Sequence, residues 1–532
     1  MHRKPVFLLS VVSGILLSLP WLFPNLGWSL LFAFVPLLLA EDLFFTTNER
    51  PNSLFFYPAF FVFIVWNVLS TWWIGYVSIA GMLIIAGLNS FIMTSVWLAG
   101  SVARRQYGAL SGFLTLVVFW LSFEFLQHHW AIPWPWLTLG NGLANSVKMI
   151  QWYEFTGVLG GSLWILLSNI LIYILVKYLF EKSFPKALRF AGYTLILLVV
   201  PICLSFLLYS RYAEKGTSIE VAVLQPNIDP YTEKFSGMSQ DAQVRKLFSL
   251  AESVVSDSTD LIIAPETAFP PMWEDSLKFD NDVRQFFSGI IRKFPNVSFI
   301  AGAMTKRKFG AGETVSETAR ESADGSFFYD IFNSALLFDR TEKIQVSHKI
   351  ILVSGVEKMP FQKYFSFMDQ FNVNLGGTNG SLASANNATM FKSINGLKIG
   401  PVICFESAFG EHSADLVKSG AQLLVVITND GWWRDSPGVW QHFGYSRIRA
   451  IENRRNIARS ANTGISGFIN QKGDVVKKNG VDSCETLCSK IKLNDEITFY
   501  SEHGEIIGKM SILLSGLIAI YILVKKWIGK GR

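Results

Sequence analysis

Three residues of different chemical type each follow a short apolar run that is rich in β-branched side chains. Glu266 comes after Leu-Ile-Ile-Ala-Pro, Lys349 after the strand-like segment 344–347, and Cys404 after Leu-Lys-Ile-Gly-Pro-Val-Ile. In α/β sheets, reactive groups gather at the carboxyl ends of the strands. We therefore expect a carboxylate, an ammonium group and a thiol to meet in one site.

This combination of groups suits covalent acyl transfer. A free thiol has a pKa of about 8.5 and is mostly protonated at neutral pH. Glu266 would act as the general base, Cys404 as the nucleophile, and Lys349 as the stabiliser of the charge that develops on the substrate's carbonyl oxygen. The backbone N–H of Phe405 is a second candidate donor to that oxygen. Taken singly, each residue has a simpler interpretation, because a cysteine that ends a buried strand is usually a small core residue.

The elements that would position these residues lie within 211–505, where the composition is that of a globular protein. Short β-branched runs alternate there with helical patterns, which is typical of an α/β layered fold. The runs lie at 219–228, 260–264, 297–303, 331–338, 397–404 and 421–428, and the helical patterns at 240–256 and 281–293. The segment 305–326 has many charged residues and glycines and few apolar positions, so we expect an exposed loop there.

The rest of the chain is too apolar for an ordinary soluble domain. Half of the 532 residues are hydrophobic and only 17% are charged, compared with about 25% in soluble domains. A helix needs roughly 20 apolar residues to cross a bilayer core. Eight segments meet this requirement: 5–24, 28–46, 54–76, 80–103, 109–127, 158–180, 188–209 and 508–526. We expect a membrane domain of seven helices at 1–210, a globular domain at 211–505, and a last membrane helix with a basic tail at 506–532.

The distribution of lysine and arginine predicts the side of the membrane on which each loop lies. With a cytoplasmic N-terminus, the cytoplasmic segments hold the following basic residues: Arg3, Lys4, Arg50, Arg104, Arg105, Lys177, Lys182, Lys186, Arg189, Lys525, Lys526, Lys530 and Arg532. The short loops on the other side, near 25–27 and 77–79, hold none, and the longer loop 128–157 holds only Lys148. This asymmetry places 211–505 outside the cytoplasm. The net charge of +6, without a dense basic block, argues against nucleic acid as a partner.

Two features of the membrane part allow more than one interpretation. The tryptophans of the loop 128–157 suit an interfacial anchor, and a wall of a lipid-binding site is the alternative. Glu124 lies near the end of a span, where a solvated carboxylate and a functional one are both open.

Several segments around the three reactive residues resemble those of the carbon–nitrogen hydrolase (nitrilase) superfamily. They are Ala-Pro-Glu-Thr-Ala at 264–268, His-Lys at 348–349, Val-Ile-Cys-Phe-Glu-Ser at 402–407, Thr-Asn-Asp-Gly-Trp-Trp at 428–433, Gln-His at 441–442, and the stretch 447–462. Together with the membrane spans, they look most like the apolipoprotein N-acyltransferase family. The resemblance implies a bundle of about eight membrane helices and a nitrilase-type α-β-β-α sandwich.

The resemblance also implies a Glu-Lys-Cys catalytic triad at Glu266, Lys349 and Cys404. Two supporting carboxylates follow, Glu357 eight residues after the lysine and Glu406 two residues after the cysteine. Either carboxylate could hold the lysine ammonium or pair with an arginine such as Arg459. The chain departs from the family where a tyrosine often follows the cysteine and Phe405 stands here, where Ser-Gly-Val at 354–356 replaces Pro-Phe-Gly, and where Phe235 stands for an aromatic that is often tryptophan.

The activity that the resemblance implies is a two-step acyl transfer. Cys404 would take a fatty acyl group from a phospholipid, with phosphatidylethanolamine as the expected donor, and form a thioester. The α-amino group of a diacylglyceryl-cysteine lipoprotein would then accept the acyl group. The resemblance places the enzyme in the bacterial inner membrane, with its catalytic domain on the periplasmic side. We expect a monomer without metal or organic cofactor, since His412 and His442 are too isolated in the sequence for a metal site.

Two other functions use the same residues differently. A membrane-anchored amidase of the nitrilase type would send the acyl group to water, although an anchor alone needs only one span. A transporter or receptor would use the outer domain only to bind a ligand, and its spans would carry paired charges along a pathway.

Two further features stay open at this stage. A disulfide between Cys484 and Cys488 is possible by spacing. Glycines within 351–380 would suit a mobile arm.

Overall fold

The computed structural model describes residues 3–46, 52–359 and 381–530, so most of the arm expected at 351–380 lies outside the described residues. The chain divides into two compact units. The first comprises Met1–Arg211 and His503–Arg532, and the second comprises Tyr212–Glu502.

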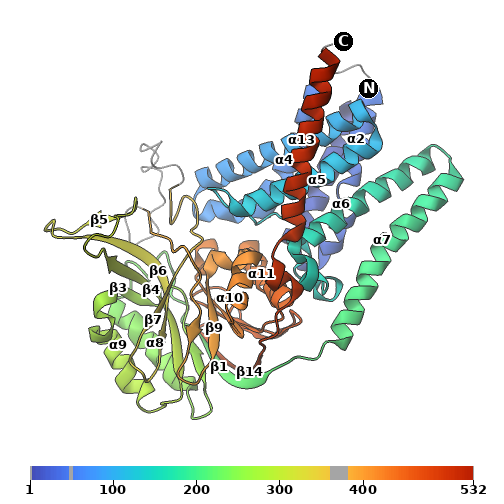
Figure 1. The fold of residues 1–532 in the computed structure, drawn as a ribbon. Helices are drawn as coiled ribbons and strands as arrows, with labels where there is room; N and C mark the ends of the chain where they lie inside the picture. Colours follow the sequence, from blue (N-terminus) through green and yellow to red (C-terminus); the bar gives the residue numbers. More distant parts are fainter. Residues whose placement is uncertain (1–2, 47–51, 360–380, 531–532) are drawn as a thin grey trace. The chain divides into compact units, whose positions relative to one another are not determined.

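The first unit is helical (Figure 1). Its long helices are α1 (Arg3–Leu22), α2 (Val35–Thr46), α3 (Phe56–Thr71), α4 (Ile79–Tyr107), α5 (Ala109–His129), α6 (Tyr153–Phe180), α7 (Phe184–Arg211) and α13 (Ile506–Lys530). The described chain contains eight helical segments that are long and apolar enough to cross a membrane, with the short helix Pro24–Leu31 extending α2. The predicted number and positions of the spans are confirmed.

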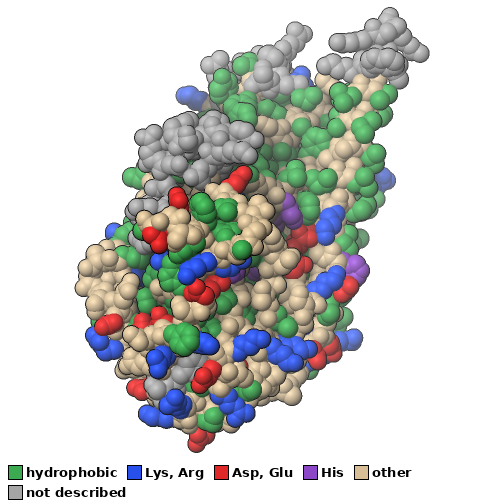
Figure 2. All heavy atoms as spheres, turned by 60° about the vertical axis from the view of Figure 1, so that its left-hand side comes forward, with side chains coloured by type: hydrophobic (Ala, Val, Ile, Leu, Met, Phe, Trp, Pro, Cys, Tyr) green, Lys and Arg blue, Asp and Glu red, His purple; other side chains and the backbone are tan. Residues whose placement is uncertain are grey.

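The surface of these helices is apolar. In Figure 2 hydrophobic side chains are spread over the helical unit, whereas charged side chains are concentrated on the α/β unit. Only 11% of the residues in the apolar stretch of α7, and likewise of α13, are buried. Large side chains such as Leu195 and Leu513, exposed by 63% and 57%, face outward. This is the pattern of a protein whose surrounding solvent is lipid.

The tryptophan-rich loop between α5 and α6 is folded into the helical unit. Trp136 and Trp152 are 1% and 8% exposed, so the interpretation of this loop as an interfacial anchor is wrong for these two rings. Glu124 is 1% exposed and accepts hydrogen bonds from the Trp120 indole at 2.9 Å and the Leu139 backbone at 2.8 Å. The carboxylate therefore fixes the loop to α5 and is not solvated.

Paired charges in the helical unit form a cluster that joins three helices. The guanidinium of Arg104 on α4 contacts Glu41 at 2.8 Å and Asp42 at 3.0 Å, both on α2. Asp42 also contacts Lys177 on α6 at 3.3 Å. All four residues lie near the ends of their helices, so the cluster crosslinks helix ends and does not line a pathway along the spans.

The second unit contains two mixed sheets. The first has the order β14 (Glu485–Leu493), β1 (Thr217–Gln225), β2 (Leu261–Ile263), β4 (Ser298–Lys308), β6 (Phe328–Phe338) and β5 (Arg320–Glu321), with β3 (Phe269–Trp273) paired to β4 and β7 (Gln345–His348) paired to β6. The second has the order β13 (Val475–Lys478), β12 (Gly467–Ile469), β11 (Ile457–Ala461), β10 (Leu423–Thr428), β9 (Lys398–Ile403) and β8 (Phe391–Lys392). All six residues of β10 are buried, as expected for a strand between two parallel neighbours that is covered on both faces.

The core residues show how these elements are layered. One apolar cluster joins the facing sides of the two sheets, through residues such as Val223 and Val425. A second cluster packs α8 (Gln240–Val254) and α9 (Asn281–Phe286) on the first sheet. A third packs α10 (Gly410–Lys418) and α11 (Pro437–Asn453) on the second sheet. Figure 1 shows the two helix pairs on opposite sides of the sheets. The expected α-β-β-α sandwich is confirmed, and the short helix α12 (Phe499–His503) follows it.

The segment 305–326 is only in part the exposed loop that its composition predicts. Strand β4 runs on to Lys308, and β5 lies within the segment. The ammonium groups of Lys306 and Lys308 lie 5.4 and 5.2 Å from the centre of the Trp273 ring, so the aromatic surface accommodates these charges in a strand.

All four cysteines are free. Cys488 lies within β14 and Cys484 immediately precedes that strand. Four residues of extended chain span about 13 Å, well beyond the roughly 7 Å limit between the Cα atoms of a disulfide. The two cysteines are therefore too far apart to pair in this fold.

Candidate active site

Glu266 lies in a tight turn that follows β2. Gly302 on the neighbouring strand β4 packs directly on this turn, and a Cβ at Gly302 would come within 2.6 Å of the Glu266 Cα. The next residue, Thr267, has a φ of +49°, a conformation that β-branched residues rarely adopt. The Glu266 side chain is buried, and its Oε1 accepts a hydrogen bond from Asn333 Nδ2 at 2.7 Å.

Lys349 follows β7 and is 1% exposed. Its ammonium lies 2.8 Å from Glu357 Oε1 and 3.5 Å from Glu266 Oε1. Burial alone would lower the pKa of Lys349, but the Glu357 and Glu266 carboxylates outweigh it and raise the pKa above its usual range. Lys349 is therefore a fixed positive charge.

Glu357 holds the lysine in place through several contacts. Its Oε1 also accepts from Asn333 Nδ2 at 2.9 Å, and its Oε2 accepts from the Val353 backbone at 2.8 Å. Asn333 therefore bridges the carboxylates of Glu357 and Glu266.

Cys404 stands at the junction of β9 and a short 3₁₀ turn (Cys404–Ala408), with a φ of +52°. Burial, and next the Glu266 carboxylate, raise the pKa of the Cys404 thiol, while Lys349 only partly offsets them. The sulfur therefore rests as a thiol and needs a base when it attacks.

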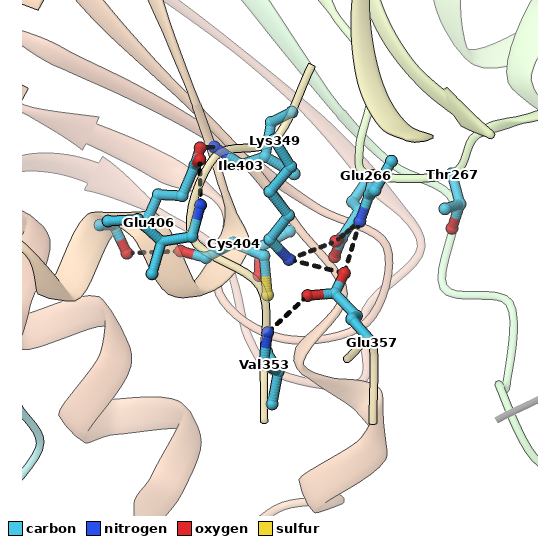
Figure 3. Close-up of polar contacts among 12 residues, drawn as sticks. Glu266, Thr267, Lys349, Val353, Glu357, Ile403, Cys404 and Glu406 are labelled. Atoms are coloured by element: carbon cyan, nitrogen blue, oxygen red, sulfur yellow. Dashed lines mark hydrogen bonds and ion pairs between the residues drawn. The ribbon is translucent and has the colours of Figure 1, made fainter. Parts of the chain in front are cut away.

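The three residues come together although they are far apart in the sequence. Figure 3 shows the Lys349 ammonium between the Cys404 sulfur on one side and the Glu266 and Glu357 carboxylates on the other. Lys349 and Glu266 both act electrostatically on the Cys404 thiol. This arrangement can deprotonate a thiol and stabilise an oxyanion, as nucleophilic acyl transfer requires.

Glu406 neither holds the lysine ammonium nor pairs with Arg459; it is buried and lies 3.4 Å from His412, which fits the further interpretation of this carboxylate as a buried salt-bridge partner. Its Oε1 accepts from the backbone N–H groups of Ile350 and Ile351 at 2.6 and 3.2 Å, and its Oε2 accepts from Ile403 at 2.8 Å. Burial opposes its charge, but His412 and these N–H groups lower the pKa of Glu406. Glu406 therefore joins the loop after Lys349 to the strand that ends in Cys404.

A second buried network holds the backbone of the cysteine. The imidazole of His442 lies 3.1 Å from the Cys404 carbonyl oxygen through Nε2 and 2.8 Å from Asp430 through Nδ1. The Ser407 hydroxyl donates to the same carbonyl at 2.8 Å. Arg459 pairs with the other oxygen of Asp430 at 2.7 Å. Burial would raise the pKa of Asp430, but Arg459 and His442 outweigh it and lower the pKa to about 2.

Replacing Arg459 with methionine is expected to destabilise the protein by about 3–5 kcal/mol, because it leaves a buried carboxylate without its cation. Thermal unfolding of the full chain, followed by circular dichroism, measures the loss. Arg245→Met is the matched control, since its contact with Asp241 is exposed and 3.9 Å long, and it should cost no more than about 0.5 kcal/mol. Equal unfolding temperatures for the two variants would contradict the role of Arg459.

If the site carries out the acyl transfer for which its groups are suited, replacing Glu357 with glutamine is expected to slow that reaction about 100-fold, because the amide keeps the shape but releases the Lys349 ammonium from its position. The rate of acylation of the cysteine is the measurement. Glu485→Gln, on an exposed residue, is the control and should leave the rate unchanged. A Glu357→Gln enzyme with the parent rate would show that this carboxylate does not position the lysine.

The other aromatic and histidine residues singled out in the sequence occupy distinct places. Phe405 is buried and packs on Phe409, with ring centres 5.1 Å apart. Phe235 is 45% exposed and stacks on Trp432 at 5.9 Å. His412 lies 3.4 Å from Glu406, so each of the two histidines considered for a metal site contacts a carboxylate. No group of side chains suited to a metal ion lies in the described ranges.

Two residues at the site were not predicted from the sequence. Asn333 lies inside β6 and bridges two carboxylates, and Lys234 lies between β1 and α8 and donates to Thr267. No sequence motif indicates a role for either residue. Each reaches the site only through tertiary contacts.

Two family models match the chain. The model for carbon-nitrogen hydrolase matches residues 220–499, and the model for the apolipoprotein N-acyltransferase N-terminal domain matches residues 13–171. The first match covers nearly all of the second unit, with all the residues of the site, and the second match lies within the helical unit.

Similar proteins also match over nearly the whole chain. An apolipoprotein N-acyltransferase of Chlorobaculum tepidum is 28% identical, over 98% of this chain and 97% of the relative. One of Geobacter metallireducens is 25% identical, over 98% and 96%. Among solved structures, a carbon–nitrogen hydrolase superfamily protein of Xanthomonas campestris matches 52% of this chain and 91% of its own, with 15% identity and a TM-score of 0.35.

Proposed function

Because the chain belongs to the apolipoprotein N-acyltransferase family, we propose that it transfers a fatty acyl group from a phospholipid to a lipoprotein through a thioester on Cys404. The acceptor is the α-amino group of the N-terminal diacylglyceryl-cysteine, and phosphatidylethanolamine is the proposed donor. The observation that carries this proposal is the buried meeting of thiol, ammonium and carboxylate in a chain whose described residues also contain eight candidate membrane spans.

The first half-reaction forms the thioester. Glu266 takes the proton of the Cys404 thiol while the sulfur attacks the ester carbonyl carbon of the phospholipid. The oxyanion forms within reach of the Lys349 ammonium and the backbone N–H of Phe405. The carbon–oxygen bond of the ester then breaks, and Glu266 returns the proton to the oxygen of the departing lysophospholipid.

The second half-reaction forms the amide. The neutral α-amine attacks the thioester carbonyl, Glu266 takes a proton from the nitrogen, and the carbon–sulfur bond breaks. The same proton returns to the sulfur, so the enzyme regains its thiol. The raised pKa of Cys404 supports this sequence, because a thiol at rest is protected from side reactions until a substrate is in place.

The membrane spans support lipid substrates, since both donor and acceptor carry acyl chains that stay in the bilayer. We propose that the second unit lies on the periplasmic side of the bacterial inner membrane, as the positions of the basic residues indicate. A thiol reagent that cannot cross membranes should label the exposed Cys484 in intact spheroplasts. Labelling only after lysis would place the unit in the cytoplasm.

The experiment that tests the function uses the purified full chain, phosphatidylethanolamine and a diacylglyceryl lipopeptide. We expect the lipopeptide to gain one amide-linked acyl group, with little free fatty acid. A membrane-anchored amidase of the nitrilase type would instead release the acyl group to water. Release of free fatty acid at the same rate with and without lipopeptide, and no acylated peptide, would overturn acyl transfer as the function.

A further inference from the structure

Lys234 is a second buried cation beside the proposed base. It is 8% exposed and lies in the turn between β1 and α8. Its ammonium donates to the Thr267 hydroxyl at 2.6 Å and to the Glu266 main-chain oxygen at 3.4 Å. The catalytic steps described above do not use this group.

The contact with Thr267 falls at a strained point of the chain. A φ of +49° is costly for a β-branched residue and persists only where the surroundings hold it. Figure 3 shows Thr267 on the far side of Glu266 from Cys404. Lys234 therefore binds the turn on the side that faces away from the reacting sulfur.

The negative charges at the site also favour the presence of a second cation. Asn333 Nδ2 lies within 2.9 Å of both the Glu266 and the Glu357 carboxylate, and Lys349 contacts both. Two carboxylates this close repel each other unless positive charge lies beside them. Lys349 supplies one charge for the two carboxylates, and Lys234, which interacts electrostatically with Glu266, supplies another.

The surroundings of Lys234 are otherwise apolar or neutral. A small cavity of about 10 Å³ lies beside it, close to the minimum volume that holds one water. Among the residues that line this cavity, Glu266 is the only ionisable one besides Lys234, and α8 contributes Gln243 and Leu247. Burial lowers the pKa of Lys234 to about 8, although the nearby Glu266 carboxylate acts in the opposite direction and favours the charged ammonium.

We propose that Lys234 is a positioning residue for the acyl-transfer reaction, which clamps the turn of Glu266 and Thr267 and supplies a second positive charge beside the Glu266 carboxylate. This inference rests on the proposed function. Lys234 therefore acts through the position of Glu266 and not on the substrate.

The test follows the rate of thioester formation on the full chain from pH 6 to pH 10, with phosphatidylethanolamine vesicles and no acceptor amine. Lys234 is charged below its pKa and neutral above it, and a neutral amine holds the Thr267 hydroxyl and the Glu266 main-chain oxygen less strongly, so the rate of the parent enzyme should fall as the pH rises through about 8. Lys234→Arg stays charged, so its rate should not fall in that range. Lys234→Met should be slower at pH 7 by about 10- to 100-fold and show no fall near pH 8. Lys343→Met, an exposed lysine, is the control and should keep the parent profile.

The outcomes separate the two proposals. A parent enzyme that forms thioester, with both Lys234 variants following its profile, would overturn the role of Lys234 alone. A fall near pH 8 that persists in Lys234→Arg would do the same, because it would belong to another group. If Lys234→Met does not fold, the profile of Lys234→Arg decides. A parent that forms no thioester at any pH would overturn the proposed function, and the role of Lys234 with it.

Discussion

Replacing Cys404 with alanine is expected to abolish acyl transfer to a lipopeptide, with a loss of at least about 10⁴-fold. In the proposed reaction, the acyl group is bonded to the enzyme only through the Cys404 sulfur. Without this sulfur the thioester cannot form, so Glu266 and Lys349 have no intermediate on which to act. The fold should survive the change, because alanine keeps the Cβ that packs against the core between the two sheets. The yield of N-acylated peptide measures the loss.

The control for this variant is Cys484→Ala, which removes an exposed thiol outside the site. It should acylate the peptide at the parent rate, and both variants should unfold within a few degrees of the parent. Acylated peptide from Cys404→Ala at more than a trace would show that the reaction does not pass through this sulfur.

Replacing Lys349 with methionine is expected to slow acylation of the cysteine about 10³-fold, since the oxyanion loses its ammonium donor. The same change leaves Glu266 and Glu357 buried without their shared cation, which should destabilise the protein by about 3–5 kcal/mol. Loss of activity in this variant alone would therefore have two explanations.

The double variant Lys349→Met with Glu357→Gln separates them. Removing one of the two carboxylates relieves the uncompensated charge, so much of the stability should return while the rate stays low. Thermal unfolding and single-turnover acylation of the same preparations provide the two readouts. A rate that recovers together with the stability would show that Lys349 is only a structural counter-ion.

The sequence alone predicts the spans and strands well for definite physical reasons. A membrane span requires roughly 20 apolar residues, and this requirement does not depend on how the rest of the chain folds. The strands β9 and β10 are buried by neighbours on both faces, so they appear as continuous apolar runs. The apolar pattern fails at the end of β4, where the Trp273 ring accommodates Lys306 and Lys308 in a strand, and at β5, whose two residues are both charged.

The contacts that hold the site together are less predictable. Glu357 and Glu406 look equivalent in the sequence, yet one carboxylate binds an ammonium and the other binds backbone N–H groups. The difference arises from the 3₁₀ turn at Cys404, which directs the side chain of Glu406 back toward Ile403. Lys234 and Asn333 likewise depend on the pairing of distant segments, which no local pattern encodes.

The most direct measurement is the mass of the purified enzyme after incubation with phosphatidylethanolamine alone. We predict a gain of one fatty acyl group, located on the peptide that contains Cys404 and removed by hydroxylamine, as a thioester requires. An enzyme that releases lysophospholipid while Cys404 stays unmodified, or that carries the acyl group on another residue, would contradict acyl transfer through this thiol.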